Sequence, residues 1–417
     1  MKSLSNSRRS FLFIFLIISL CFVLIKCIDR GNKNHDTSND IAFDQYAGTQ
    51  ACEKCHRQIY DSFLTTSHFL SSQPANEKYM RGNFGKDSNT FHYNDKVFVK
   101  MLKTDSGYYE MKSEYGMDEM IGRIDIIIGS GNKGQTYLTW KDNNLHQLPV
   151  AYLTSVDGWV NNPGSGNNLT VDRTINARCI ECHGTFAGGL SPGFNGATYF
   201  NPREIIYGIG CEKCHGPGAK HVAYYTNHPK EISAKFIVNP GSFSRQQSLD
   251  LCRACHGGRI KNLKPPFTFK PGDKLKDYFV VSNIANTANI DVHGDQYDLL
   301  AESKCFNTST LTCITCHDTH ANERGNLTLF SQRCMTCHNG EHGTFCKIKS
   351  VPTELIKNNC IDCHMPAESS NLIVMKMADS SKMKPALLRT HLIKVYPDAT
   401  KKFLAAKISS GSAKKYN

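Results

Sequence analysis

The pattern Cys-x-x-Cys-His occurs seven times in this chain and constrains its fold more than any other feature. The copies lie at residues 52–56, 179–183, 211–215, 252–256, 313–317, 334–338 and 360–364. With 18 Cys and 17 His among 417 residues, chance placement would give about 0.03 copies. The repetition therefore reflects required chemistry and not composition.

Three kinds of chemistry use cysteines at this spacing. Zinc needs four ligands that converge on one ion, and a His fused to the second Cys points poorly towards such an ion. A redox-active dithiol needs one motif, so seven copies would be unexplained. Covalent haem c uses all three residues, because two thiols form thioethers with the porphyrin and the adjacent imidazole binds the iron. The motifs predict seven haem c groups, with zinc ribbons as the alternative.

The residues expected to hold these haems follow directly from the motifs. The predicted thioether cysteines are Cys52, Cys55, Cys179, Cys182, Cys211, Cys214, Cys252, Cys255, Cys313, Cys316, Cys334, Cys337, Cys360 and Cys363. The predicted proximal iron ligands are His56, His183, His215, His256, His317, His338 and His364.

The first residues bear on this prediction, because haem c is attached outside the cytoplasm. Arg8 and Arg9 precede an apolar run at 11–25, which is typical of a signal sequence or a short membrane anchor. Cleavage, lipidation at Cys27 and retention as an anchor stay open, since Lys26 makes a poor lipoprotein junction. Twin-arginine export is disfavoured because that route carries folded proteins. The body of the chain is expected in the periplasm, soluble or tethered to the membrane.

The formal charge of +12 first suggests a nucleic-acid-binding protein. Seven haems would add about 14 propionate charges, which leaves roughly −2 when every iron is reduced. The basic residues are therefore interpreted as haem compensation, and no nucleic-acid partner is expected. The expected partners are redox proteins: a quinol-oxidising complex, other cytochromes or a terminal reductase.

Motif spacing and composition divide the chain into six segments. We predict a signal sequence or anchor at 1–27, a polar tether at 28–48, a first haem segment at 49–84, a β-rich insert at 85–170, a haem core with the other six motifs at 171–368, and a C-terminal segment with a distal histidine at 369–417.

Alternating apolar residues in the long gap after the first motif predict strands joined by turns, with an irregular haem-covering loop as the alternative. The predicted strands lie at 96–104, 107–115, 124–129, 135–140 and 145–153. After residue 171 the stretches NARCIECHG, SLDLCRACHGG and QRCMTCHNG predict short helices that end in motifs. The expected fold class is mainly short α-helices and loops packed around covalent haems, with a small β-rich unit near 85–155.

The sixth iron ligands separate an electron carrier from an enzyme, because an iron with histidine on both faces has no vacancy for a substrate. Ten histidines lie outside the motifs, and seven would be enough to complete every iron. The ten are His35, His68, His92, His146, His221, His228, His293, His320, His342 and His391. His320 and His342 follow motif histidines by three and four residues, so on a helix they must serve other haems if they are ligands. For them a role as propionate partners or surface residues stays open. Met365, next to His364, meets the same restriction, so a His/Met iron is weakly supported.

Several stretches resemble multihaem c-type cytochromes with the cytochrome c-554/c-552-type domain, related to the tetrahaem acceptor of hydroxylamine oxidoreductase. They are CEKCHRQIYDSFLTTSH, GIGCEKCHGPGAKHV, SLDLCRACHGG, DVHGDQYDLLAESKCF, TCITCHDTHA and NCIDCHMP, and they cover most of 50–368. The resemblance implies that His68, His221, His293 and His320 are distal ligands, and it favours His391 in RTHLIKVY as another. Together with His342, these complete the predicted set of iron ligands.

The sequence therefore predicts a periplasmic heptahaem cytochrome that transfers electrons through closely packed, mostly bis-histidine haems. The alternative is a multihaem oxidoreductase acting on small nitrogen or sulfur compounds at one open haem. Similar nitrite reductases attach the catalytic haem through Cys-x-x-Cys-Lys, which this chain lacks, whereas the crosslinked tyrosine of hydroxylamine oxidoreductases stays open among 17 Tyr. A component of an outer-membrane conduit or haem filament would share every motif.

Two finer expectations concern single residues. The haem at His256 is the expected place for an open iron, since no histidine lies between it and His293, and His92, His146 and His228 are its uncertain donors. Cys305 and Cys346 lie outside the motifs and are expected to form a disulfide, with two free buried thiols as the alternative.

Overall fold

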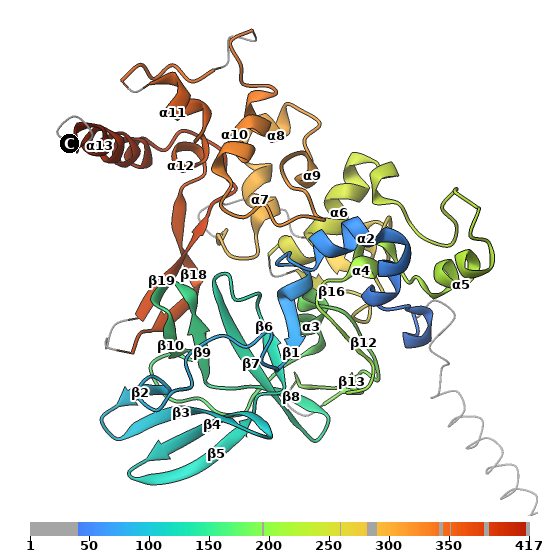
Figure 1. Ribbon diagram of the computed structural model, residues 1–417, viewed down its shortest axis with the longest axis vertical. Helices are drawn as coiled ribbons and strands as arrows, with labels where there is room; N and C mark the ends of the chain where they lie inside the picture. The colour runs from blue at the N-terminus through green and yellow to red at the C-terminus, as the bar shows by residue number, and fades with distance from the viewer. Residues whose placement is uncertain are drawn as a thin grey trace, which may run out of the picture. The chain divides into compact units, whose positions relative to one another are not determined.

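The computed structural model describes residues 41–193, 196–258, 260–281, 290–341, 345–350, 352–378 and 383–413. The apolar run at 11–25, Cys27, His35, His342 and most of the expected tether lie outside these ranges. The described residues from 42 onward belong to one compact unit, and Figure 1 labels its α-helices and most of its strands.

The helices of this unit are short. The α-helices are α2 (Glu53–Phe63), α3 (Ala177–His183), α4 (Cys211–His215), α5 (Ala219–Asn227), α6 (Arg245–His256), α7 (Gln296–Ala301), α8 (Lys304–Asn307), α9 (Cys313–Cys316), α10 (Leu327–Met335), α11 (Thr353–Lys357), α12 (Ile361–His364) and α13 (Pro397–Ala413). The 3-10 helices are η2 (Phe43–Gln45), η3 (Thr49–Cys52), η4 (Phe69–Ser71), η5 (Thr154–Val156), η7 (Pro240–Ser242) and η8 (Leu275–Asp277).

Although none of the described residues between β17 and β18 form a strand, strands extend well beyond the expected insert. They are β1 (Ser72–Pro74), β2 (Thr90–Asn94), β3 (Val97–Thr104), β4 (Gly107–Glu114), β5 (Met117–Arg123), β6 (Ile126–Ile128), β7 (Gly134–Lys141), β8 (Asn144–Gln147), β9 (Val150–Leu153), β10 (Gly158–Asn161), β11 (Arg173–Thr174), β12 (Gly184–Ala187), β13 (Ser191–Pro192), β14 (Thr198–Tyr199), β15 (Ile205–Tyr207), β16 (Lys261–Asn262), β17 (Phe279–Val280), β18 (Ala367–Lys376) and β19 (Met383–Arg389).

The sheets correct the expected fold class. A nine-stranded sheet runs in the order β1-β6-β7-β8-β14-β13, with β9, β10 and β11 attached beside this path. A four-stranded sheet follows the order β2-β3-β4-β5, and β12-β15, β16-β17 and β18-β19 form three two-stranded sheets. The prediction of mainly short helices and loops is therefore wrong. The expected strands at 96–104, 107–115 and 135–140 do coincide with β3, β4 and β7, but strands continue well past residue 170.

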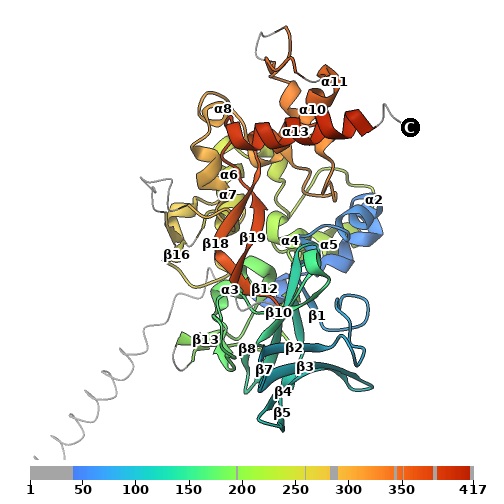
Figure 2. The same cartoon turned by 90° about the vertical axis from the view of Figure 1, so that its left-hand side faces the viewer.

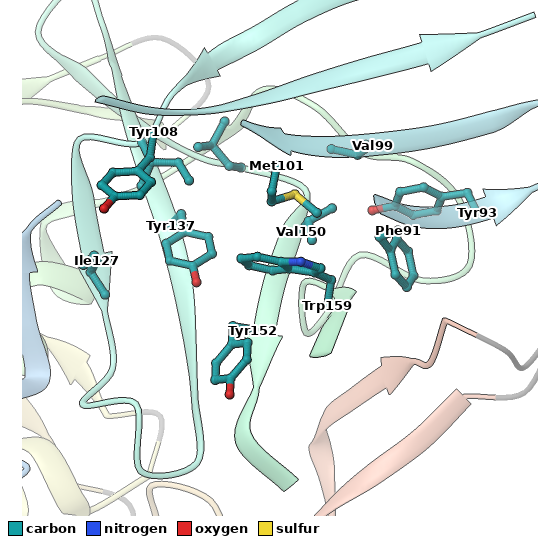
Figure 3. Packing of buried hydrophobic residues seen from close by; sticks show 12 residues of the cluster. Phe91, Tyr93, Val99, Met101, Tyr108, Ile127, Tyr137, Val150, Tyr152 and Trp159 are labelled. Carbon is teal, nitrogen blue, oxygen red and sulfur yellow. The ribbon is translucent and has the colours of Figure 1, made fainter. Parts of the chain in front are cut away.

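The core of the strand-rich part explains why these segments form sheets. Along β3 the alternation of VFVKMLKT buries Val99 and Met101 while Lys103 stays exposed. These two side chains pack with Tyr137 and Trp159 in one cluster, shown in Figure 3. A period of two apolar residues places one face of a strand against a core, so this packing follows from the sequence pattern.

A second cluster links the large sheet to the first helix after it. Leu138 of β7 and Leu145 of β8 pack with Ile180 of α3 and Phe186 of β12. The helix that contains the second motif therefore lies against the sheet through ordinary apolar packing.

The β18-β19 hairpin joins the C-terminal helices to the sheets (Figure 2). The backbone N–H of Lys376 at the end of β18 donates to the side chain of Asn161 in β10, and Val160 forms an antiparallel bridge with Met377. Residues far apart in the sequence are thereby held in one unit.

Candidate haem centres

All seven motifs begin in or next to a helical turn, and the fourth and sixth begin in the last turn of a longer helix. In α3, α4, α6 and α12 the motif histidine is the last helical residue, while α9 ends one residue before His317 and α10 ends inside its motif at Met335. Residues three and four apart share one face of a helix, so both cysteines and the histidine project to the same side. At the first motif, His56 departs from helical dihedrals, with φ −116° and ψ 36°. The short helices predicted before the second, fourth and sixth motifs are confirmed as α3, α6 and α10.

Side-chain caps fix where three of these helices begin. The Asn176 carboxamide accepts from the Cys179 N–H at the start of α3, and Asn326 accepts from the Leu329 N–H at the start of α10. Ser244 and Gln247 form a reciprocal capping box at the start of α6. Such caps satisfy N–H groups that have no partner within the helix, so a polar residue determines where each of these three helices begins.

Four motif histidines face a second histidine from a distant part of the chain. In each pair the two imidazole rings lie at a similar separation, although their planes are rotated by different angles. The pairs are His56 and His221 at 6.5 Å, His68 and His256 at 6.1 Å, His215 and His320 at 6.1 Å, and His317 and His391 at 6.2 Å between ring centroids.

This separation fits an iron atom between the two rings. An imidazole nitrogen binds a first-row metal at about 2.0 Å and lies about 1.1 Å from its ring centre, so two imidazoles on opposite sides of one metal have centres about 6.2 Å apart. Direct contacts between rings span about 4.5 to 7 Å between centroids, so the argument also depends on which rings are paired: one ring of each pair belongs to a Cys-x-x-Cys-His motif. The four pairs thus have the dimensions that bis-histidine haem requires, and a zinc ribbon does not predict two facing imidazoles.

A fifth motif histidine lies near His293. His183 is half-buried, and the desolvation of its ring, together with the charge of the His293 imidazole, lowers the pKa of His183 to about 4. The side chains of Ser71 and Ser72 both donate to the backbone carbonyl of His183, at 2.9 and 2.7 Å. The second motif is therefore held against β1 with a histidine close to its imidazole.

Burial keeps several of these imidazoles neutral. It lowers the pKa of His68 to about 4, with the nearby His256 and His317 acting in the same direction, and it lowers the pKa of His391 to about 4. Burial also lowers the pKa of His215 and His317. A neutral imidazole has the free lone pair that a metal ligand needs, so the environment favours the ligating form.

Backbone and side-chain oxygens hold the Nδ1 atoms of several rings. The Nδ1 atom of His215 lies 2.9 Å from the Val238 carbonyl, and that of His221 lies 2.8 Å from the Lys235 carbonyl. The Nδ1 atom of His256 lies 3.1 Å from the Gln296 side chain. A partner at one ring nitrogen sets the tautomer and leaves Nε2 for the metal, which is the usual arrangement around metal-bound histidine.

Cysteines of different motifs also lie next to one another. Direct thiol contacts join the motifs pairwise, and weaker electrostatic contacts link Cys214 with Cys255 and Cys334 with Cys316. The directly contacting pairs are Cys52 with Cys211, Cys182 with Cys255, Cys252 with Cys313, and Cys334 with Cys360. The motifs therefore neighbour one another in the order first, third, fourth, fifth, sixth and seventh, and the second lies beside the fourth.

Glu212, inside the third motif, is a positioning residue that sequence reasoning missed. Its buried carboxylate accepts three backbone N–H bonds, from Ala47 at 2.8 Å, Gly48 at 2.9 Å and Gly218 at 2.7 Å. Gly48 precedes the helical turn of the first motif, and Gly218 precedes α5, which contains His221. One carboxylate thus fixes the starts of both elements that bring His56 and His221 together.

Other residues between motif cysteines have similar roles. Arg253 forms a buried ion pair with Asp298 at 2.8 Å, which ties α6 to α7. Glu181 accepts from the Phe267 N–H at 2.7 Å and pairs with Arg178 at 2.8 Å. Charged residues inside a motif were the available signal, because a buried charge needs a partner.

The expectation for the iron at His256 is corrected by the structure. His68 lies opposite His256, while the three suggested donors lie elsewhere. His92 contacts Phe98 in the four-stranded sheet, His146 lies in β8 near Asp172, and His228 stacks on Tyr224. The sequence could not locate His68, because 188 residues separate it from His256.

The expected disulfide is also corrected, because Cys305 and Cys346 are both free thiols in the structure. Cys305 lies near Cys316 and Cys337, whereas Cys346 lies near Cys363. Each thiol thus neighbours a different motif. Loop length alone could not show this, since closing a loop also requires the two Cβ atoms to meet.

None of the helices in the described ranges combines the length and the apolar character that crossing a bilayer requires. No group of three or more His, Cys, Asp and Glu side chains in these ranges is arranged about one ion.

Comparison with known proteins points to one class. Residues 134–216, which include the second and third motifs, match the family model described as cytochrome c554 and c-prime. Cytochrome c-554 of Nitrosomonas europaea is 29% identical over 108 residues, which is 23% of this chain and 43% of the relative. These matches support a c-type cytochrome. Such a family implies covalently bound haem c, although the chain spans less than half the length of the curated relative.

The fold has a counterpart among solved structures. The crystal structure of the outer cell wall cytochrome OcwA superposes with a TM-score of 0.54, covering 86% of this chain and 81% of that chain. The two sequences are 19% identical, so this likeness concerns the fold alone. It extends well beyond the family match at 134–216.

Proposed function

We propose that this chain is a periplasmic heptahaem c-type cytochrome that transfers electrons between redox partner proteins. Bound haem c supplies a one-electron iron couple, whose potential depends on the axial ligands and their surroundings. The observation that carries the proposal is the set of facing imidazole pairs, at 6.1 to 6.5 Å between ring centroids.

The ligands proposed for each iron follow from these positions. In the motif order, the first iron would be held by His56 and His221, the third by His215 and His320, the fourth by His256 and His68, and the fifth by His317 and His391. The second would take His183 with His293. The last two irons would use His338 and His364 on their proximal side.

The contacts between motif cysteines support a carrier and not a set of isolated centres. Cys182 and Cys255 touch, Cys252 touches Cys313, and both contacts meet at the fourth motif. Porphyrins attached at these cysteines would be close neighbours, as transfer between them requires. The resulting order has ends at the first, second and seventh motifs, where partner proteins would have access.

The side chains around each iron would limit rearrangement when its charge changes. His215 is fixed by the Val238 carbonyl and His221 by the Lys235 carbonyl, and the Glu212 carboxylate of α4 accepts from Gly218 at the start of the helix that contains His221. Ligands held from outside keep their orientation in both oxidation states. This rigidity suits repeated one-electron transfer.

The proposed location and attachment rest on the N-terminal sequence. Arg8 and Arg9 before the apolar run at 11–25 support export, and haem c attachment takes place on the outer side of the cytoplasmic membrane. The proposed partners are a quinol-oxidising complex, other cytochromes or a terminal reductase, reached from a soluble or membrane-tethered form.

The proposal is tested by intact mass spectrometry of the protein produced in a host that matures c-type cytochromes. The processed chain should carry seven haem masses, and a reductive titration should take up seven electrons per chain. The variant Cys363→Ser should weaken attachment at the seventh motif, whereas the matched variant Cys305→Ser, outside the motifs, should keep all seven. Five or fewer haems on the native chain would refute the proposal.

A further inference from the structure

The chain around the proposed distal ligand His221 lies at one edge of the unit. α5 and the residues after it are found at this edge in Figure 1, and we call residues 219–236 the α5 surface. The Nδ1 atom of His221 lies 2.8 Å from the Lys235 carbonyl. The Nε2 atom, which would bind the first iron, points the other way, so Lys235 and the adjacent Phe236 lie outside the haem pocket. The α5 surface therefore covers the distal side of the first haem site.

Two apolar side chains of the α5 surface face solvent. Ile232 is 97% exposed and Phe236 is 58% exposed. Phe236 also has a positive φ of 57°, a backbone conformation that disfavours a residue with a Cβ atom. Beside them, residues 227–232 line an open hollow. Strained backbone is more common at functional sites than elsewhere, and exposed apolar side chains are the ones that a protein interface buries at its centre.

Lysines flank these two apolar side chains in the sequence. Lys220 and Lys230 are exposed, and neither forms an ion pair with any described residue. Glu231 is the one acidic residue at 219–236, and its carboxylate pairs with Lys235 at 3.3 Å. Two positive charges are thus left unpaired within the described part of the chain, and they complement a protein surface that is rich in Asp and Glu.

Contacting aromatic rings connect the α5 surface with His221. The ring centroids of Phe236 and Tyr224 are 5.4 Å apart, and those of Tyr224 and Tyr225 are 5.2 Å apart. The Tyr225 ring in turn lies 4.7 Å from the His221 ring. The Lys235 ammonium holds this arrangement, since it donates to the Tyr224 hydroxyl at 3.1 Å. These distances are those of rings in contact, so the path from the exposed Phe236 to the proposed ligand has no gap.

We propose that the α5 surface is the docking site of an acidic one-electron redox protein, and that electrons enter the series of haems there. This inference deepens the proposed function and rests on it. The partner would place its acidic residues against Lys220 and Lys230 and would cover Ile232 and Phe236. One electron then passes from its reduced centre to the ferric iron at the first motif, so the partner is oxidised by one electron and that iron becomes ferrous. The first motif is one end of the order of motif contacts, which suits a point of entry.

The test uses oxidised flavodoxin as the probe, because this small acidic flavoprotein can bind in that state without donating an electron. Isothermal titration calorimetry with the haem-loaded protein should show binding at low ionic strength that weakens as salt is added. A carbodiimide joins carboxylates to lysine amines in contact with them, and it should link flavodoxin to Lys220 or Lys230 in peptide maps. Crosslinks confined to other lysines, or binding that does not depend on salt, would overturn the proposal.

Two sets of variants separate the charges from the apolar contact. Lys220→Glu with Lys230→Glu should weaken binding at low ionic strength by about tenfold. The matched change is Lys86→Glu with Lys384→Glu, at two exposed lysines outside the α5 surface, and it should have a much smaller effect. Phe236→Asn keeps a residue that tolerates positive φ, and it should weaken binding by about fivefold at every ionic strength. Equal effects of the two lysine pairs, or no effect of Phe236→Asn, would contradict the proposed surface.

Reduction rates separate this inference from the proposed function. Flavodoxin hydroquinone should reduce the variant with Lys220→Glu and Lys230→Glu more slowly than the native protein, while photoreduced lumiflavin, a small neutral reductant, should reduce both at the same rate. If the native protein holds seven haems and lumiflavin reduces it, but the variants bind flavodoxin as the native protein does, the docking site is wrong and the proposed function stands. Five or fewer haems on the native chain would instead remove the proposed function, and this inference with it.

Discussion

Replacing Glu212 tests how one side chain inside a motif positions another haem site. Its carboxylate is 4% exposed and accepts the N–H groups of Ala47, Gly48 and Gly218 at 2.7 to 2.9 Å. Glu212→Ala would leave these three donors without their acceptor. The starts of the first motif and of α5 would then lose their common anchor, so the His56–His221 pair should loosen.

The size of the effect follows from the number of bonds. A hydrogen bond to a charged group contributes about 1.5 kcal/mol, so three of them give a loss of about 4.5 kcal/mol in the free energy of unfolding. Glu212→Gln keeps one carbonyl oxygen, which would still accept part of the set, and should cost about half as much. Both variants should also shift the spectrum of one bis-imidazole iron, because the pinned elements contain the ligands of one site.

The assay is guanidinium unfolding of the holoprotein followed by far-ultraviolet circular dichroism, with magnetic circular dichroism of the folded variants. Glu77→Ala is the matched control, because Glu77 is an exposed carboxylate paired with Lys103, and such pairs contribute little. A loss below about 1 kcal/mol for Glu212→Ala, or a similar loss for Glu77→Ala, would refute the anchoring role.

Three further predictions follow from particular contacts. Glu110 lies fully buried with one N–H partner, Val150, and burial raises its pKa well above the usual value. The folded state then holds a proton that the unfolded state has released, so the free energy of unfolding should fall as pH rises from about 4.5. Glu110→Gln should reduce the difference in that free energy between about pH 5 and pH 8, and an equal difference in the native protein and the variant would contradict this. Arg253→Met should destabilise by about 3 kcal/mol by leaving Asp298 unpaired, and the double change with Asp298→Leu should recover much of the loss in the same assay. Alkylation of the denatured protein without reductant should label both Cys305 and Cys346 in peptide maps. Protection of both from labelling would instead show that they form a disulfide.

The haem motifs and the local elements around them could be predicted from the sequence, because they depend on residues only a few positions apart. Cysteines three apart and a histidine directly after them meet on one helical turn, as in α4, whatever the rest of the fold does. The same holds for the alternation in β3 and for the capped starts of α3 and α6. In each case neighbours within a few residues determine the structure.

The fold class could not be predicted from the sequence, because most strands after residue 170 are too short to show an alternation of apolar and polar residues. β13, β14, β16 and β17 have two residues each, and they form only because a partner strand is already in place. The β18-β19 hairpin docks on β10 through Asn161, a contact across 215 residues. Tertiary context of this kind overrides local propensity.

The sequence also could not predict which histidines face each other, for a related reason. Nothing near His256 in the sequence points to His68, and the pairing arises because the turn after α2 meets the end of α6 in the folded unit. The resemblance to a known family supplied His68 as a ligand but not its partner. Sequence thus indicated which histidines matter, and the structure indicated which of them face each other.

The most direct test of the account is anomalous diffraction from crystals of the mature protein at the iron absorption edge. The account predicts seven iron peaks per chain, with four of them between His56 and His221, His68 and His256, His215 and His320, and His317 and His391. Fewer than seven peaks, or any of these four histidine pairs without iron between them, would contradict it.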